Sequence, residues 1–324
     1  AGSVENLSDL PSPKRHEFVH GNIIDADTVE SIIREKYIDT IVHFAAETHV
    51  DKSIIGPAKF IETNIIGTFN LLETVRRNWL EGDPKTTGRV HFHHVSTDEV
   101  YGSLSHEENA FTEETSYKPR SPYSASKASS DHLVRSYYHT YGLPVTITNC
   151  SNNYGPYQFP EKLIPVVILN AIAGLPIPIY GDGRQIRDWL HVEDHCNAIH
   201  LVIQKGELGE TYLVGGNNQP SNIELVELIC SILDELLPES AFIPHQNLIQ
   251  FVKDRPGHDR RYDVNISKIR KRLGWTPRIT FEAGILDTVR WYLENSTWIE
   301  KIQQRDEYAG WIQMNYEKRG EGKK

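Results

Sequence analysis

The sequence predicts an α/β protein with a doubly wound parallel sheet and a smaller α/β lobe. Stretches rich in β-branched and aromatic residues alternate with amphipathic helical stretches in the first half, at residues 40–44, 64–79, 90–95 and 123–141. This alternation is typical of a parallel sheet with crossover helices. From about residue 152 the pattern loosens into short strands and polar turns, which indicates a second lobe. We therefore expect one domain at residues 1–151 and a second at 152–324, with some of the later chain crossing back into the first domain.

The spacing of apolar residues predicts the individual elements. Residues 1–15 are polar and turn-rich, with no strand or helix period. In the first half, strands are expected at 17–20, 40–44, 90–95 and 144–149, and helices at 27–36, 64–79 and 123–141. In the second half, helices are expected at 161–173, 192–204, 223–236, 264–273 and 281–295, a strand at 211–214, and a frayed end at 320–324.

Composition excludes several classes of protein. The net charge of −10 argues against a nucleic-acid partner, which a basic surface would favour. No apolar run reaches the roughly 18 residues of a membrane span, and no signal-peptide pattern opens the sequence. The three cysteines, Cys150, Cys196 and Cys230, have no metal-like spacing and suit reduced, buried thiols. We expect a soluble, cytoplasmic protein without a nucleic-acid or membrane partner.

Chemistry concentrates between residues 95 and 127. The strand at 90–95 runs into Ser-Thr-Asp-Glu, so that Thr97, Asp98 and Glu99 lie where the strand ends, and ligands bind at such ends in open α/β sheets. On the following helix, Tyr123 and Lys127 are four residues apart and share one face. A cation beside a phenol lowers its pKa from about 10 toward neutral, so this set predicts proton transfer around a carbonyl that hydride transfer makes or consumes.

Tyr-x-x-x-Lys alone is a weak signal, because such a pair on an exposed helix is usually two solvated neighbours. The two carboxylates change this, since adjacent like charges after a buried strand must be solvated or held by donors. Tyr-x-x-x-Lys together with the two adjacent carboxylates is a strong signal of a catalytic site.

Further motifs are Phe44-Ala-Ala-Glu-Thr-His-Val-Asp51, Asn149-Cys-Ser-Asn-Asn-Tyr-Gly-Pro156, the segment 181–193 and Asp254-Arg-Pro-Gly-His-Asp259. Together with the two motifs above, they closely resemble those of the dTDP-glucose 4,6-dehydratases, a branch of the extended short-chain dehydrogenase/reductase family. The resemblance runs from Ala1 nearly to the C-terminus with the motifs in family order. It implies a Rossmann-like NAD-binding domain, a nucleotide-sugar-binding lobe, and a homodimer through a four-helix bundle of the helices at 60–78 and 123–141.

The start of the sequence departs from this family pattern. A dinucleotide fold begins with a strand, a Gly-rich turn and a helix that holds the pyrophosphate, and no such turn precedes Val19. We therefore expect this chain to lack the first β-α-β unit.

The resemblance implies the ligand-binding residues. For NAD they are Asn22, Ile23, Ala45, Ala46, Glu47, Thr63, Tyr123, Lys127 and Asn153. For dTDP-glucose they are Thr48, Thr97, Asn152, Lys162, Leu163, Pro178, Ile179, Tyr180, Arg187, Asn222, Arg255 and His258. Independently of the family, Arg187 and Arg255 lie in turns where a guanidinium could grip phosphate oxygens.

The implied reaction is dehydration of dTDP-glucose to dTDP-4-keto-6-deoxyglucose by internal hydride transfer through NAD. Tyr123 and Lys127 would act at the C4 hydroxyl, Thr97 at the C4 oxygen, Glu99 as base at C5, and Asp98 as acid at the C6 hydroxyl. Two alternatives stay open. One is an NAD-dependent nucleotide-sugar epimerase or decarboxylase, which shares Tyr-x-x-x-Lys but lacks these carboxylates. The other is an inactive fragment that only binds nucleotide.

Three further features do not require a functional interpretation. His191 and His195 are expected on one helix face but have no third ligand nearby in sequence, so we expect no metal. The histidines at 91, 93 and 94 are expected to be partly buried and hydrogen-bonded. The polar loop at 103–122 fits an active-site cover about as well as a solvated connection.

Overall fold

A parallel sheet lies at the centre of the computed structural model, which describes residues 2–82 and 89–305. Its strand order is β1 (Thr40–His43), β2 (His91–Thr97), β3 (Val145–Cys150) and β7 (Thr211–Val214), and every neighbouring pair is parallel. The α/β fold class predicted from the sequence is therefore confirmed. The strands at 40–44, 90–95, 144–149 and 211–214 were predicted to within two residues.

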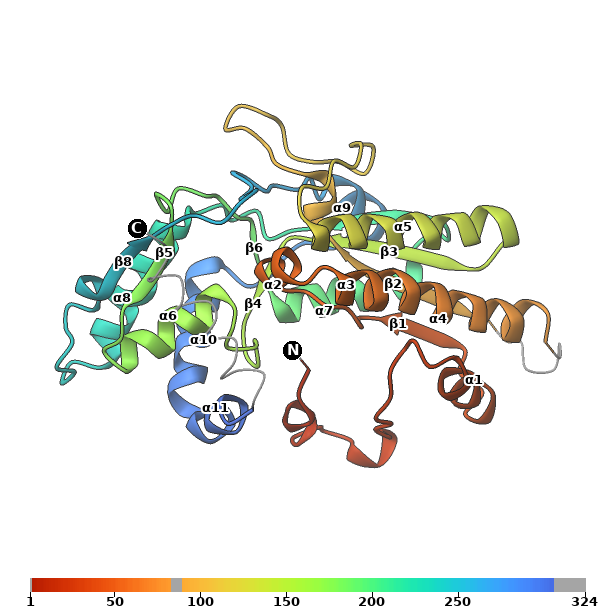
Figure 1. Cartoon of the computed structure of the whole chain (residues 1–324), viewed down its shortest axis with the longest axis horizontal. Helices are drawn as coiled ribbons and strands as arrows, with labels where there is room; N and C mark the ends of the chain where they lie inside the picture. The colour runs from red at the N-terminus through yellow and green to blue at the C-terminus, as the bar shows by residue number, and fades with distance from the viewer. Residues whose placement is uncertain (1, 83–88, 306–324) are drawn as a thin grey trace.

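Helices cover both faces of this sheet (Figure 1). His94 contacts Ser130 of α5 (Pro122–Tyr141), whereas the neighbouring His93 lies near His195 of α7 (Val192–Lys205). Because successive side chains of a strand point to opposite faces, α5 and α7 pack on opposite sides of β2. The other helical segments of this part are α1 (Ala26–Glu35), α2 (Val50–Ile55), α3 (Ala58–Phe60), η3 (Ile61–Gly67), α4 (Thr68–Val75), η4 (Arg76–Leu80) and η6 (Asp98–Tyr101).

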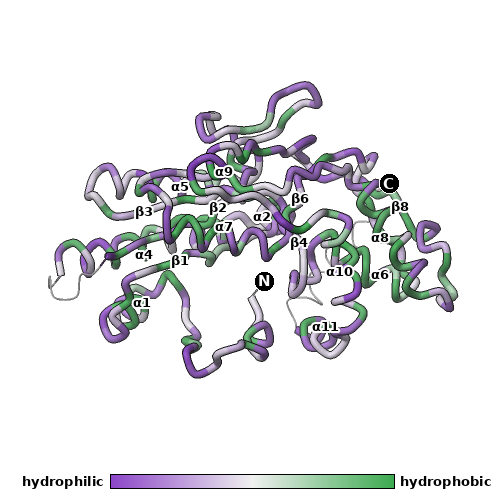
Figure 2. Tube along the Cα trace, turned by 180° about the vertical axis from the view of Figure 1, so that it is seen from behind, coloured by the Kyte–Doolittle hydropathy of each residue, from purple (hydrophilic) through white to green (hydrophobic). Residues whose placement is uncertain are grey.

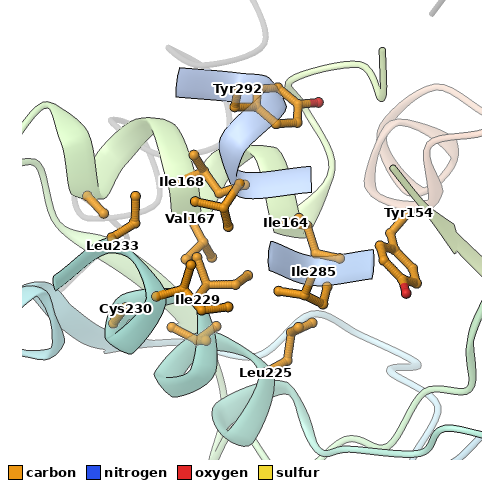
Figure 3. Close-up of a cluster of buried hydrophobic side chains, with 14 of the residues drawn as sticks. Tyr154, Ile164, Val167, Ile168, Leu225, Ile229, Cys230, Leu233, Ile285 and Tyr292 are labelled. Carbon is orange, nitrogen blue, oxygen red and sulfur yellow. The ribbon is translucent and has the colours of Figure 1, made fainter. Parts of the chain in front are cut away.

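A second group of elements lies at the left of Figure 1. Two small parallel sheets pair β4 (Asn152–Tyr154) with β6 (Trp189–His191), and β5 (Ile177–Tyr180) with β8 (Ile249–Val252). The helical elements here are α6 (Leu163–Ile172), α8 (Asn222–Leu236), η7 (His245–Leu248), α10 (Phe281–Glu294) and α11 (Ser296–Gln303). Hydrophobic side chains of α6, α8 and α10 interdigitate in one core, as Figure 3 shows.

The chain returns to the first sheet after residue 152. β7 joins the sheet beside β3, and α9 (Ser267–Leu273) packs against β7. A single hydrophobic cluster accordingly unites residues from both halves, including Val100 and Tyr101 with Leu213 and Tyr262.

Some predicted elements differ in the structure. Residues 17–20 are exposed and form no strand, since no neighbouring strand in the described chain satisfies their backbone groups. The helix predicted at 264–273 begins only at Ser267. The N-terminal segment contains the 3-10 turns η1 (Val4–Leu7) and η2 (Pro13–Arg15). The frayed end expected at 320–324 lies outside the described residues.

The loop between η6 and α5 is anchored rather than merely solvated. Many of its residues are hydrophilic (Figure 2), but Leu104 and Phe111 are buried. The Leu104 N–H donates to the Arg261 carbonyl (3.0 Å) and the Phe111 N–H to the Asp263 carbonyl (2.9 Å). The loop therefore packs on the strand-like segment that carries Tyr262.

Candidate active site

The segment after β2 presents two adjacent carboxylates at the carboxyl end of the sheet. β2 ends at Thr97, whose side-chain oxygen accepts a hydrogen bond from the Glu99 N–H (3.2 Å) and so caps η6. Gly102 closes this turn with a φ of 92°, and a side chain there would collide with the Lys118 carbonyl. The tight turn fixes Asp98 and Glu99 next to each other.

Helix α5 brings Tyr123 and Lys127 to the same place. It begins with a capping box in which Ser121 and Ser124 satisfy each other's backbone N–H groups. Both Tyr123 and Lys127 are buried, and Lys127 Nζ donates a hydrogen bond to the Val95 carbonyl of β2 (2.9 Å). The two sequence motifs, about twenty residues apart, thus meet in space.

The Asp98 carboxyl favours its protonated form. Burial, followed by the charge of Glu99, raises the pKa of Asp98 well above its usual range. One of its oxygens is buried without a hydrogen-bond partner. Burial contributes more to this shift than the neighbouring charge does. Burial also raises the pKa of Glu99, while Arg255 and Arg187 oppose this shift.

The expectation that the Tyr123 pKa is drawn toward neutral is wrong for this structure. Burial raises it well above its usual value, and Glu99 raises it further. A hydrogen bond from the Thr97 hydroxyl acts in the opposite direction and lowers the pKa of Tyr123. The Lys127 ammonium points to the Val95 carbonyl and is itself buried, so that burial lowers its own pKa. Tyr123 is therefore a neutral phenol here.

A cleft of about 990 Å³ opens beside these carboxylates. It is lined by eleven of the twelve residues predicted to hold the nucleotide sugar, together with Glu99; the exception is Thr97. The eleven are Thr48, Asn152, Lys162, Leu163, Pro178, Ile179, Tyr180, Arg187, Asn222, Arg255 and His258. The lining comes from both halves of the chain, so the cleft lies between them.

Cations gather on one wall of this cleft. The Arg187 guanidinium stacks over the ring of Tyr262 (4.3 Å to the centroid) and donates to the Asp259 carbonyl (2.9 Å). Arg255 lies 3.4 Å from the Asp51 carboxylate. The His258 ring lies 2.6 Å from Asp254, but burial lowers its pKa to about 4, so it adds no positive charge near neutral pH. Such a wall suits an anionic ligand.

Sequence reasoning missed several lining residues: His49, Val50, Asp51, Glu161, Val166, Trp189 and Tyr262. Asp51 is 2% exposed, and its carboxylate accepts a hydrogen bond from the Tyr180 hydroxyl (3.1 Å). Lys52 and Glu161 form an ion pair at 2.6 Å across the same boundary. The sequence offered one indication of these residues: Asp51 lies in the motif that follows β1.

The residues predicted to hold NAD lie outside this cleft, around the ends of β1 and β3. Ala45, Ala46 and Glu47 follow β1, and Thr63 lies on η3. Asn22 and Ile23 precede α1, with the Ile23 carbonyl held by Asn70 of α4 (2.6 Å). Asn153, in β4, lies 2.9 Å from the ring of His195.

Asn64 was also missed. It is buried, accepts the Glu47 N–H (2.8 Å), and donates to both the Glu47 carbonyl (3.0 Å) and Ser126 of α5 (2.8 Å). It therefore fastens the loop after β1 to the helix that carries Tyr123 and Lys127.

The histidines at 91, 93, 191 and 195 pack against or hydrogen-bond with other side chains of the fold. His191 ends β6 and only His195 lies within α7, so the predicted shared helix face is wrong. The described parts of the chain contain no group of His, Cys, Asp and Glu side chains that could hold a metal ion. His91 and His93 hydrogen-bond with Thr146 (2.8 Å each), as expected, but they are buried rather than partly buried. Of the three cysteines expected to be buried, Cys230 is buried, Cys150 is partly buried and Cys196 is exposed.

Known proteins resemble this chain over nearly all of its length. A family model described as GDP-mannose 4,6 dehydratase matches residues 1–288. The dTDP-glucose 4,6-dehydratase of Salmonella typhimurium is 52% identical over 98% of this chain and 90% of its own length. The dTDP-glucose 4,6-dehydratase 1 of Escherichia coli K12 is 53% identical over the same shares. The chain belongs to the dTDP-glucose 4,6-dehydratase family. The resemblance stated from the sequence is confirmed.

Solved structures agree with the family. A Streptomyces venezuelae dTDP-glucose 4,6-dehydratase crystallised with NAD superimposes with a TM-score of 0.83 at 44% identity, covering 93% of this chain and 87% of that one. The UDP-glucose 4-epimerase of Thermotoga maritima, 26% identical, gives a TM-score of 0.77 over 91% of this chain and 89% of that one. The fold is thus shared with epimerases, while the family's dehydratases are more similar in sequence.

Proposed function

We propose that this chain dehydrates dTDP-glucose to dTDP-4-keto-6-deoxyglucose by an internal redox cycle through NAD. The observation that carries the proposal is the buried Asp98, held protonated beside Glu99 at the edge of the cleft. Elimination of water from a sugar needs both an acid and a base, and this pair supplies them. More than half of the residues are identical to those of relatives named for the same reaction.

The cleft suits the nucleotide diphosphate part of the substrate. Arg187 and Arg255 present guanidinium groups for the diphosphate, and Lys162 adds a third cation. Asn152, Asn222, His258 and the strand segment from Pro178 to Tyr180 would contact the remaining nucleotide, while Thr48 and Thr97 would contact the sugar.

The cofactor would lie beside the cleft, in the first domain at residues 1–151, with residues 152–324 mainly holding the sugar nucleotide. Asn22, Ile23, Ala45, Ala46, Glu47, Thr63 and Asn153 would line it, together with Tyr123 and Lys127. The small side chains of Ala45 and Ala46 at the end of β1 fit close approach of a ligand. When bound, NAD would accept a hydride from C4 of the sugar and return it to C6.

Tyr123 would take the proton of the C4 hydroxyl. Burial holds the phenol neutral before the ligands bind. Tyr123 must therefore first release its own proton to solvent, and Lys127 would stabilise the phenolate that then accepts the C4 hydroxyl proton. Thr97 would donate a hydrogen bond to the new C4 carbonyl and stabilise the charge that develops there.

The two carboxylates would then carry out the elimination. The C4 ketone acidifies the C5 proton, and Glu99 removes it while Asp98 donates its proton to the departing C6 hydroxyl. Glu99 returns its proton to C5 when hydride reaches C6. After one cycle Tyr123 has gained a proton and Asp98 has lost one. The Thr97 hydroxyl, 3.4 Å from Asp98 and interacting with Tyr123, offers the route that resets both.

An epimerase of the same superfamily is the second candidate, because its fold matches. Epimerisation at C4 removes and returns one hydride and expels no water. It needs no counterpart to Asp98 and Glu99, so the two carboxylates favour dehydration.

Asp98→Asn tests the assignment, because the amide keeps the shape and loses the proton. With dTDP-glucose and added NAD, the variant should oxidise C4 and accumulate reduced cofactor while 4-keto product falls by about 10²-fold or more. The wild-type chain should form product under the same conditions. Full turnover by the variant would overturn the assignment of Asp98 as the acid.

The nucleotide-binding fragment remains the non-enzymatic alternative. A chain that binds dTDP tightly but neither takes up NAD nor forms product would support it. Restoration of product by an N-terminally extended chain would separate a missing cofactor unit from a wrong substrate.

We further propose a homodimer in the cytoplasm. Ile61, Ile66 and Phe69 on η3 and α4 are almost half exposed, α5 packs beside both elements, and Ala125 on α5 is exposed. An apolar helix pair of this kind is suited to a four-helix interface.

The three free cysteines fit a reducing compartment. In the described ranges, no helix has the length and apolarity that crossing a membrane requires.

A further inference from the structure

The Tyr123–Lys127 pair is part of a longer stripe on α5. Asp131 and Arg135 follow at the same four-residue interval, so all four side chains lie along one helix face. This face packs against β2 and the loop before α5. Asp131 is fully buried, which is costly for a carboxylate and calls for specific partners.

The ring of His94 lies between Asp131 and Lys127. One ring nitrogen faces both groups and can hydrogen-bond with only one of them, so the link between Asp131 and Lys127 is electrostatic. Lys127 Nζ lies 3.5 Å from His94 Nε2, and the same ring nitrogen lies 3.2 Å from Asp131 Oδ1. His94 comes from β2, so the link joins the helix to the strand that leads into Thr97. The order of groups is phenol, ammonium, imidazole and carboxylate.

Hydrogen-bond donors also hold the second oxygen of the Asp131 carboxylate, the one that does not face His94. Asp131 Oδ2 accepts hydrogen bonds from the Tyr117 hydroxyl (2.7 Å) and from Asn149 Nδ2 (3.0 Å). Arg135 in turn donates to the Tyr117 hydroxyl (2.7 Å). The Asn149 amide also donates to the Thr97 carbonyl (3.1 Å). These contacts tie Asp131 rigidly to both catalytic segments.

We propose that Asp131, acting with His94, is the positioning residue that keeps the Lys127 ammonium charged and in place beside Tyr123. The proposal rests on the function proposed above and adds a buried counter-charge to it. Asp131 touches neither substrate nor cofactor in this scheme and acts only through Lys127.

The electrostatics of the site agree with this role. Burial lowers the pKa of Lys127, and Asp131 is the largest opposing influence, followed by Cys150 of β3. Burial opposes ionisation of Asp131, but His94 and Lys127 outweigh it and lower its pKa to about 2. His94 itself is kept neutral, because burial lowers its pKa to about 4.

The other titratable groups around this pair do not replace Asp131. His43 of β1, Cys150 of β3 and Tyr123 lie around Lys127, and burial keeps all three neutral. Tyr101 faces Asp131, and burial raises its pKa. Removing the Asp131 charge therefore leaves a buried ammonium whose neutral form is favoured, and an uncharged Lys127 cannot stabilise a phenolate.

The test compares Asp131→Asn with Asp131→Glu in the full chain. With dTDP-glucose and NAD, single-turnover reduction of the cofactor reports the step that uses Tyr123. Asp131→Asn should slow this step about tenfold or more near neutral pH, with little change in KM. The defect should shrink as pH rises, because the wild-type Lys127 then loses its own charge. Asp131→Glu keeps a carboxylate and should preserve the wild-type pH profile, even if its packing lowers stability.

Thr146→Val is the matched structural control. Thr146 is buried in β3 and hydrogen-bonds with His91 and His93 on the opposite face of β2. This variant should lower stability without changing the pH profile. A loss in Asp131→Asn that stays constant with pH, or that Asp131→Glu shares equally, would overturn the proposal in favour of simple packing.

A second readout separates this proposal from the proposed function. In protein labelled with ¹³C at lysine Cε, the Lys127 resonance, assigned with Lys127→Arg, reports its titration without turnover. Asp131→Asn should shift this titration to lower pH. An unchanged titration overturns the role of Asp131 whether or not the wild-type chain turns over dTDP-glucose. A shifted titration in a chain without activity would uphold that role and count against the reaction alone.

Discussion

A buried histidine in α7 should make the protein measurably sensitive to acid. His195 is buried, its Nδ1 lies 2.9 Å from Asn153 Oδ1, and burial alone lowers its pKa to about 4. An unfolded histidine has a pKa of about 6.5. Below that pH the unfolded chain takes up a proton that the folded chain refuses. The free energy of unfolding therefore falls as pH drops from about 6.5 toward 4.

The size of this effect follows from the two pKa values. A single group with a folded pKa of about 4 loses about 1.3 kcal/mol of stabilisation between pH 7.5 and pH 5.5. Buried acids such as Asp188, whose pKa burial raises to about 7, act in the opposite direction. These opposing contributions are the same in wild type and in a His195 variant, so they cancel in the comparison.

The assay is urea unfolding of wild type and His195→Gln at both pH values. Glutamine cannot titrate, so the variant should lose about 1.3 kcal/mol less than wild type on acidification, whatever its stability at neutral pH. His200→Gln is the matched control, because His200 lies on the same helix but is exposed. Equal losses in wild type and His195→Gln would refute the reasoning. A change in His200→Gln as large as that in His195→Gln would refute it too.

Two further predictions concern packing and assembly. Gly284→Ala should lower the free energy of unfolding by about 1–3 kcal/mol. The new methyl group would collide with the Tyr154 hydroxyl in the core formed by α6, α8 and α10. Thermal unfolding checks this against Gly56→Ala, whose methyl would have its nearest neighbour at 4.0 Å. Phe69→Asp should convert the proposed dimer to monomers in sedimentation, because it places a charge in the apolar helix pair. Phe18→Asp changes a similarly exposed phenylalanine in the segment before α1 and should leave the assembly unchanged.

Much of the site could be predicted because its motifs are local. The Tyr123–Lys127 interval fixes a shared helix face, and the strand before Thr97 fixes where Asp98 and Glu99 emerge. The family resemblance then supplied the cleft residues, and eleven of the twelve line one cavity. These predictions depend on short-range geometry or on motifs that can be read in order along the chain.

Other features depend on contacts between distant segments. Asn64 joins Glu47 to Ser126, and Asp51 meets Arg255 more than two hundred residues later. No periodicity within either segment indicates the partner. The strand expected at 17–20 failed for a related reason, since strand residues need a neighbour that sequence alone does not supply.

By itself, the sequence determined the α/β class, the family and the identity of the residues that carry the proposed chemistry. The tertiary structure decided their protonation states. The sequence predicted a Tyr123 pKa drawn toward neutral by Lys127, whereas burial raises it, and burial also contributes most to the raised pKa of Asp98. The reason is physical: a pKa reflects desolvation and every nearby charge in three dimensions, and both are set by which segments of the chain pack around the group.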